Sequence, residues 1–83
     1  MTFIDKKKEI KKYIENNFDE LLEKDDEYEV IDVSNGYIEF DTYKGSVSVD
    51  NDMLLTLPGD DSFSIEEIEK YFNLLKFLKK LFV

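Results

Sequence analysis

The run Tyr37–Tyr43, which follows directly on Asn35-Gly36, constrains the fold of this chain most strongly. Apolar and polar residues alternate through it, with Ile38, Phe40 and Thr42 on one side and Tyr37, Glu39, Asp41 and Tyr43 on the other. Alternation of this kind is typical of a strand that buries one face. Asn-Gly between two apolar runs favours a tight hairpin turn. The sequence therefore predicts an antiparallel hairpin whose outer face carries acids and tyrosines.

The segments around this strand extend the prediction from a hairpin to a sheet. Tyr28–Val33 precedes the Asn-Gly turn, Ser46–Asp50 follows a second turn at Lys44-Gly45, and Met53–Leu57 is a shorter apolar run. Pro58-Gly59-Asp60-Asp61 ends this region, because proline presets the backbone angle of a turn and glycine permits a positive φ. We predict a meander of three strands and, from the shorter run, a fourth.

The N-terminal segment has the periodicity of an amphipathic helix. Its apolar residues recur at spacings of three, four and seven positions, at Phe3, Ile10, Ile14, Phe18, Leu21 and Leu22. On a helix of about five turns these spacings place the residues on one face. We expect the acidic run at positions 24–27 to end this helix, with a weak point at Asn16-Asn17.

The C-terminal segment has the clearest helix signals in the chain. Ser64 and Glu67 have the spacing of a capping box, and lysines gather near the other end. Its apolar residues cover about half of the helical circumference at a hundred degrees per residue. They are Ile65, Ile68, Tyr71, Phe72, Leu74, Leu75, Leu78, Leu81 and Phe82, and Phe77 falls on the polar side.

Together these elements predict one α+β domain over residues 1–83. We expect a three- to four-stranded antiparallel sheet meander with an N-terminal and a C-terminal helix packed on one face. The expected core takes Phe3, Ile10, Ile14, Phe18 and Leu21 from the first helix, Val30, Ile38, Phe40, Val47, Val49 and Leu55 from the sheet, and Ile68, Phe72, Leu75 and Leu78 from the second helix.

Charge is distributed unevenly along the chain. Residues 13–69 carry eighteen Asp and Glu residues against only Lys24 and Lys44, and the formal net charge is −9. The two ends of the chain are lysine-rich. A domain with so acidic a middle repels nucleic acid and anionic membranes, and it attracts basic protein surfaces over a range set by the salt concentration.

The missing residue types argue against catalysis. The chain has no His, Cys, Arg or Trp, so the usual general bases, thiol nucleophiles and soft metal ligands are absent. Asp50-Asn51-Asp52 opens like a calcium-binding loop, but Met53 and Leu54 stand where a ligand and the turn glycine belong. We therefore expect no enzyme activity, no cofactor and no specific metal site.

The order of elements is shared with double-stranded-RNA-binding domains, which place basic residues at the start of their second helix. Here that stretch contains Glu66, Glu67 and Glu69, so we expect no direct nucleic-acid binding. The N-terminus lacks the apolar run of a signal peptide, and no segment has membrane-spanning length. The expected location is the cytoplasm, with no membrane partner.

The function that these features favour is binding to a basic protein. Carboxylates two apart on a strand are about 6.6–6.8 Å apart, comparable with successive phosphates of a nucleic acid. We predict an inhibitor of the DNA-mimic or anti-defence type that covers the basic surface of a nucleic-acid-handling protein. The expected contact residues are Tyr37, Glu39, Asp41, Tyr43, Asp50 and Asp52. An immunity protein or antitoxin would have the same chemistry, and a merely solvated sheet face is the plain alternative.

The apolar C-terminal helix supports an alternative function of a different class. A structural homodimer or adaptor could assemble through a seam at Phe77, Leu81 and Phe82, where apolar residues are bordered by lysines. In that case the acidity would serve solubility, and salt would affect assembly little. The plainer expectation is that this helix is used fully as core.

Overall fold

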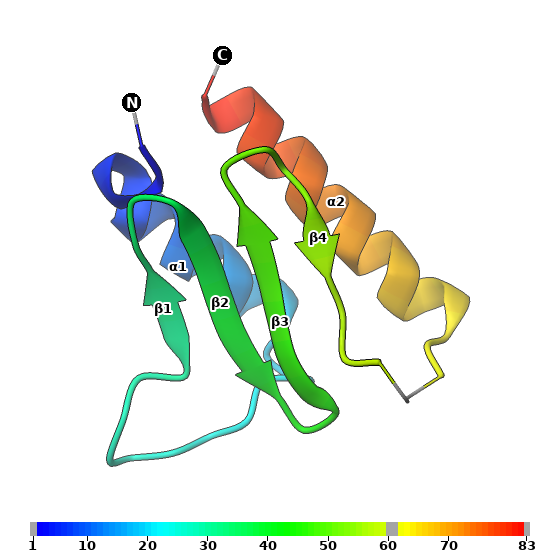
Figure 1. Cartoon of the computed structure of the whole chain (residues 1–83). Coiled ribbons are helices and arrows are strands. Elements are labelled where there is room, and N and C mark those ends of the chain that lie inside the picture. The colour runs from blue at the N-terminus through cyan, green and yellow to red at the C-terminus, as the bar shows by residue number, and fades with distance from the viewer. Residues whose placement is uncertain (1, 60–61, 83) are drawn as a thin grey trace.

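A four-stranded antiparallel sheet covered on one face by two helices makes up the computed structural model, which describes residues 2–59 and 62–82 (Figure 1). In chain order the elements are a short 3-10 helix η1 (Phe3–Lys6), α1 (Lys7–Asn17), β1 (Ile31–Val33), β2 (Tyr37–Thr42), β3 (Gly45–Asp50), β4 (Leu55–Thr56) and α2 (Ile65–Leu81). The strands follow one another across the sheet in the order β1-β2-β3-β4. The predicted α+β class, the meander and the position of both helices on one face are confirmed.

The register of the strands aligns their apolar residues on the helix-covered face. Ile38 on β2 lies opposite Val33 on β1 and Val49 on β3, and Phe40 lies opposite Ile31 and Val47. All six of these side chains are buried. The Asn35-Gly36 turn joins β1 to β2, and beside it the Ser34 amide donates a hydrogen bond to the Tyr37 carbonyl at 2.9 Å. The hairpin predicted from Asn-Gly is therefore present.

The first helix is shorter than predicted, because its last apolar residues pair with the sheet. α1 ends at Asn17, and the Phe18 carbonyl accepts hydrogen bonds from the amides of both Leu21 and Leu22. The chain then runs beside the end of β2, where Leu22 bridges Thr42. Phe18 and Leu21 are still buried, but through a turn rather than a fifth helical turn.

Two predicted strands are also shorter than expected. β1 begins at Ile31 rather than at Tyr28, because the 21–23 segment already occupies the place beside the end of β2. β4 covers only Leu55–Thr56, because Met53 lies in the preceding turn with a left-handed φ of 65°. The predicted turn after β4 is described only in part, since Asp60 and Asp61 lie outside the described residues.

The core contains most of the predicted residues but uses a different face of α2. Every core residue predicted from the first helix is buried, and Val30, Leu55 and Leu75 are partly buried. The prediction was wrong for Ile68 and Phe72, which are 37% and 57% exposed. Leu78 is buried as predicted, and the other two buried residues of α2 are Tyr71 and Leu74.

Aromatic contacts explain this rotation of α2. Phe77, which sequence spacing placed on the polar side, stacks on Tyr13 of α1 with ring centroids 4.1 Å apart. Tyr71 packs against Phe18 at 5.2 Å. Because these contacts turn the Phe77 side of the helix toward α1, Ile68 and Phe72 on the opposite side face outward. Ring packing, which helical periodicity does not describe, therefore selected the buried face.

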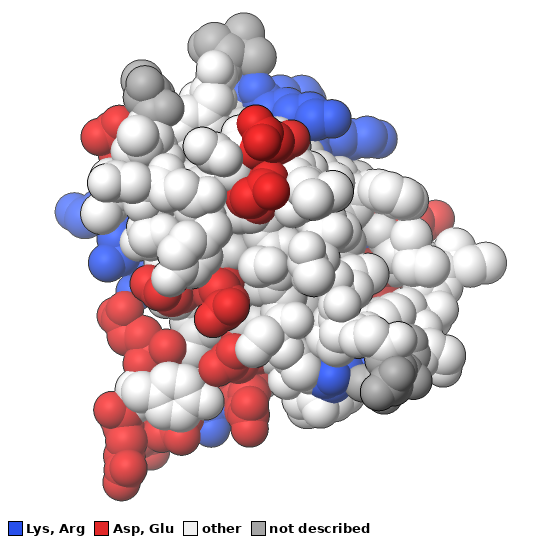
Figure 2. Space-filling view, viewed as in Figure 1, with Lys and Arg blue, Asp and Glu red and all other residues white. Residues whose placement is uncertain are grey.

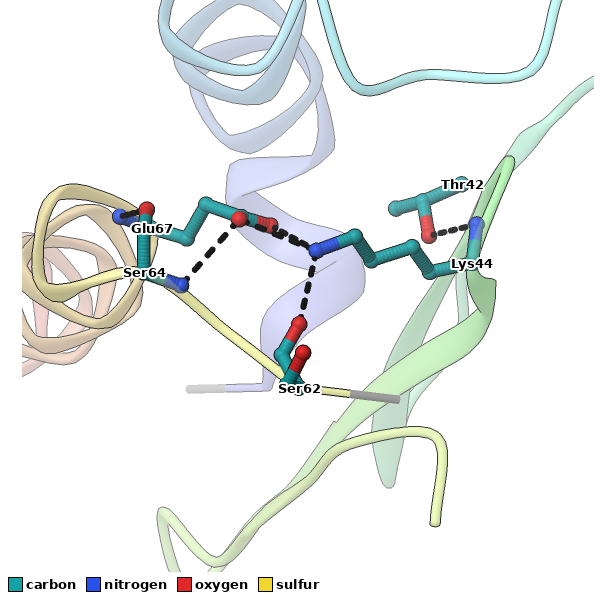
Figure 3. A network of polar contacts seen from close by, with 5 residues as sticks. All are labelled: Thr42, Lys44, Ser62, Ser64 and Glu67. Carbon is teal, nitrogen blue, oxygen red and sulfur yellow. Dashed lines mark hydrogen bonds and ion pairs between the residues drawn. The ribbon is translucent and has the colours of Figure 1, made fainter. Parts of the chain in front are cut away.

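One lysine ties the β2–β3 turn to the start of α2 (Figure 3). The Lys44 ammonium lies 3.0 Å from each carboxylate oxygen of Glu67, 2.9 Å from the Ser62 carbonyl oxygen and 4.9 Å from the centroid of the Phe63 ring. Ser64 and Glu67 form the predicted capping box. Hydrogen bonding to Lys44 is the main cause that lowers the pKa of Glu67 below its usual 4.5.

Candidate protein-interaction surface

Within the described residues, no helix covers the outer face of the sheet (Figure 1). The strands place acids, one tyrosine, two serines and a threonine on that face. We call this surface the acidic sheet face and define it by Asp32 of β1, Tyr37, Glu39 and Asp41 of β2, and Asp50 of β3. Figure 2, viewed from the same side, shows acidic side chains across this face and many more at the lower left, where the 18–30 segment lies in Figure 1. The acidic sheet face thus continues into residues 18–30, which we call the acidic loop.

The centre of the acidic sheet face is a pair of like charges. Asp32 lies directly opposite Glu39 in the β1–β2 register. The Tyr37 hydroxyl donates a hydrogen bond to Asp32 at 3.2 Å, and this bond is the main cause that raises the pKa of Tyr37. Within the described residues, the Glu39 carboxylate has neither a hydrogen-bond donor nor a lysine beside it. Glu39 is therefore an exposed, unpaired charge that faces another carboxylate.

Asp41 is held more tightly than Glu39. Its carboxylate accepts hydrogen bonds from the Ser46 hydroxyl at 2.8 Å and from the Tyr28 hydroxyl at 3.4 Å. Partial burial first, and then the nearby acids Glu23, Asp41 and Asp25, raise the pKa of Tyr28. Tyr28 therefore links the acidic loop to the acidic sheet face.

The remaining predicted contact residues lie toward the ends of the sheet. Tyr43 follows β2 and is 64% exposed. Asp50 lies opposite Tyr37, but one of its oxygens accepts the amides of Asp52 and Leu54 at 3.0 and 2.9 Å. Asp50 thus holds the β3–β4 turn, which leaves Asp52 as the freer carboxylate there. The structure groups Tyr37, Glu39 and Asp41 on one strand, with Asp50 beside them.

Sequence reasoning missed Asp32 and Tyr28 as members of this surface. A signal for Asp32 was present, because a two-residue turn at Asn35-Gly36 pairs positions symmetrically about it and so places Asp32 opposite Glu39. No local signal indicated Tyr28, which reaches Asp41 only because the chain before β1 leaves the sheet.

The lysines of the described residues do not neutralise the acidic sheet face. The three ion pairs found are Lys11–Glu29 at 3.0 Å, Lys24–Asp19 at 3.6 Å and Lys44–Glu67 at 3.0 Å. None of them includes a carboxylate of the acidic sheet face. The described residues also contain no group of three His, Cys, Asp or Glu side chains arranged to hold a metal ion. The surface therefore presents uncompensated negative charge and aromatic area.

The residues of the predicted dimer seam have partners within their own chain. Phe77 stacks on Tyr13, and Phe82 meets Phe3 edge to face with ring centroids 5.5 Å apart. Leu81 is partly buried against the core. A dimer seam at Phe77, Leu81 and Phe82 stays a prediction.

Comparison of the chain with protein-family models, with curated proteins and with solved structures finds no match. Across the described ranges, neither α1 nor α2 combines the length and apolar character needed to cross a membrane. Function is therefore inferred from the surfaces described above.

Proposed function

We propose that this protein is a non-enzymatic inhibitor that binds a basic surface of a nucleic-acid-handling protein and thereby blocks it. The observation that supports this most is the pairing of Asp32 with Glu39 on a sheet face where no described helix covers them and no described lysine forms an ion pair with them. Like charges directly opposite each other destabilise a sheet. A partner that brings positive charge to this face would turn that repulsion into attraction.

Two further properties of the acidic sheet face suit protein binding. Carboxylates at Glu39 and Asp41 follow one strand at the spacing noted above, so a surface shaped for phosphates can meet them. Tyr37 and Tyr28, both partly exposed, offer aromatic contact area beside the acids. Association through such a face is steered by charge, and its rate falls as salt rises.

The test compares two double variants that change the net charge equally. Asp32→Lys/Glu39→Lys reverses the sign at the centre of the acidic sheet face but keeps two like charges opposite each other. Glu9→Lys/Glu15→Lys makes the same change on exposed positions of α1. Each tagged protein is incubated at low salt with lysate of the native host, and retained proteins are identified by mass spectrometry.

We expect the wild type and the α1 variant, Glu9→Lys/Glu15→Lys, to retain a basic nucleic-acid-binding protein that added DNA or salt releases. The sheet variant, Asp32→Lys/Glu39→Lys, should no longer retain this partner. Equal retention by the sheet variant would contradict the proposal, and so would a partner that neither DNA nor salt displaces.

A further inference from the structure

The N-terminal half of α2 carries an apolar face that no described part of the chain covers. Ile65, Ile68 and Phe72 are 76%, 37% and 57% exposed. Their spacings of three and four positions place them on one side of the helix. In Figure 2 the edge of the molecule over the yellow and orange part of α2 is mostly free of charged atoms. We call these three residues the outer α2 face.

Charges of both signs border the outer α2 face. Glu69 lies in the first half of the helix and Lys76 in the second half. Both are exposed, and neither forms an ion pair with another described residue. Glu69 and Lys76 are equally far from the point just after Phe72, and at a hundred degrees per residue they lie on the same flank of this face. The helix is thus electrostatically complementary to a reversed copy of itself.

We infer that the protein forms a twofold-symmetric homodimer in which the outer α2 faces of two chains pack antiparallel. A twofold axis near Phe72 buries the three apolar side chains of each copy against those of the other. It also places Glu69 of one chain beside Lys76 of the partner subunit, and symmetry repeats this contact. A parallel arrangement would bring acids beside acids and lysines beside lysines.

This dimer is separate from the predicted seam at Phe77, Leu81 and Phe82, because those side chains lie on the side of α2 that faces its own chain. It is also separate from the acidic sheet face. The inference therefore goes beyond the proposed function, and either one can fail without the other.

The first test measures mass against protein concentration by sedimentation equilibrium, from micromolar to hundreds of micromolar. The mass of the wild type should rise from the 9.9 kDa of one chain toward twice that value. Phe72→Glu should weaken the dimer by more than about a hundredfold, because the central contact is lost twice. Leu54→Glu is the matched control, since Leu54 is apolar and 64% exposed but lies in the β3–β4 turn. Circular dichroism verifies that both variants are folded.

The second test uses the antiparallel charge pairing. Glu69→Lys and Lys76→Glu should each weaken self-association by about tenfold, because each places like charges at both symmetric contacts. Mixing the two variants should restore the dimer, since a Glu69→Lys chain and a Lys76→Glu chain have opposite charges at both contacts.

A wild type that stays monomeric over the whole series would overturn the inference and leave the outer α2 face to a partner of different sequence. The same holds if Phe72→Glu dimerises normally or if Leu54→Glu is equally disruptive. Failure of the mixed variants to associate would overturn the antiparallel arrangement.

Discussion

Replacing Glu39 by Lys should stabilise the fold while it removes binding to a basic partner. Glu39 faces Asp32 across β1 and β2 and has no ion pair within the described residues. At a charge separation of about 6 Å in water, the repulsion is about 0.7 kcal/mol. Salt at physiological strength reduces it to about half. Reversing one charge changes repulsion into attraction, so the expected gain in the free energy of unfolding is about 0.7 kcal/mol.

Thermal and urea unfolding measure this gain. For a domain of this size, the expected rise in Tm is about 3–5 °C. Glu39→Gln should give about half the effect, because it removes the repulsion without adding attraction. The control Glu15→Lys makes the same change in net charge on α1, away from the Asp32–Glu39 pair, and should shift Tm less.

High salt should reduce the difference in Tm between Glu39→Lys and the wild type. The reasoning would be refuted if Glu39→Lys lowered Tm, or if Glu15→Lys raised it as much. A sheet in which this pair costs no stability would not need a basic partner to relieve it.

Three other perturbations test the way the fold is held together. Gly45→Ala should lower the free energy of unfolding by about 2 kcal/mol in urea titrations. The reasons are that Gly45 has a φ of 128° and that an added Cβ would lie 2.9 Å from the Cβ of Pro58. A loss below about 0.5 kcal/mol would contradict this close packing. Because the pKa of Glu67 is lowered in the folded state, its contribution to stability is present above pH 4.5 and is lost as pH falls through the folded-state pKa. Lys44→Met should flatten this loss of stability at acid pH and lower the free energy of unfolding by about 1 kcal/mol at neutral pH. An unchanged dependence of stability on pH would contradict the role of Lys44. Burial raises the pKa of Tyr71 from 10.0 to about 12. The contribution of Tyr71 to stability is therefore fully present below pH 10.0, and about 2–3 kcal/mol is lost as pH rises through 12. In alkaline unfolding experiments, Tyr71→Phe should lose most of this pH dependence.

Local patterns were sufficient to predict the elements of the fold. Strand alternation in Tyr37–Tyr43, the Asn35-Gly36 turn and the Ser64–Glu67 capping box each depend on residues close in sequence, and each is present in the structure. The end of α1 was predicted only in part: α1 ends at Asn17, within the expected weak point Asn16-Asn17, but the apolar spacing predicted a longer helix. Leu21 and Leu22 continue the helical spacing, but they pair with the end of β2, which lies about twenty residues away in the chain.

Local sequence patterns also did not predict which face of α2 is buried. Its apolar residues cover too much of the circumference for periodicity to select one buried face, and the stacking of Phe77 on Tyr13 decided it. For the candidate surface, the acids and the single tyrosine of β2 were predictable from alternation. The structural role of Asp50 and the link from Tyr28 to Asp41 depend on the paths of the turn and the loop, which the spacing of residues does not specify.

The most direct test of the central claim is competition between this protein and duplex DNA for the basic partner recovered from lysate. Fluorescently labelled DNA bound to that partner is titrated with the wild type, with Asp32→Lys/Glu39→Lys and with Glu9→Lys/Glu15→Lys. The wild type and the α1 variant should displace the DNA, and the sheet variant should not. Simultaneous binding of DNA and protein, or equal displacement by the sheet variant, would contradict the account.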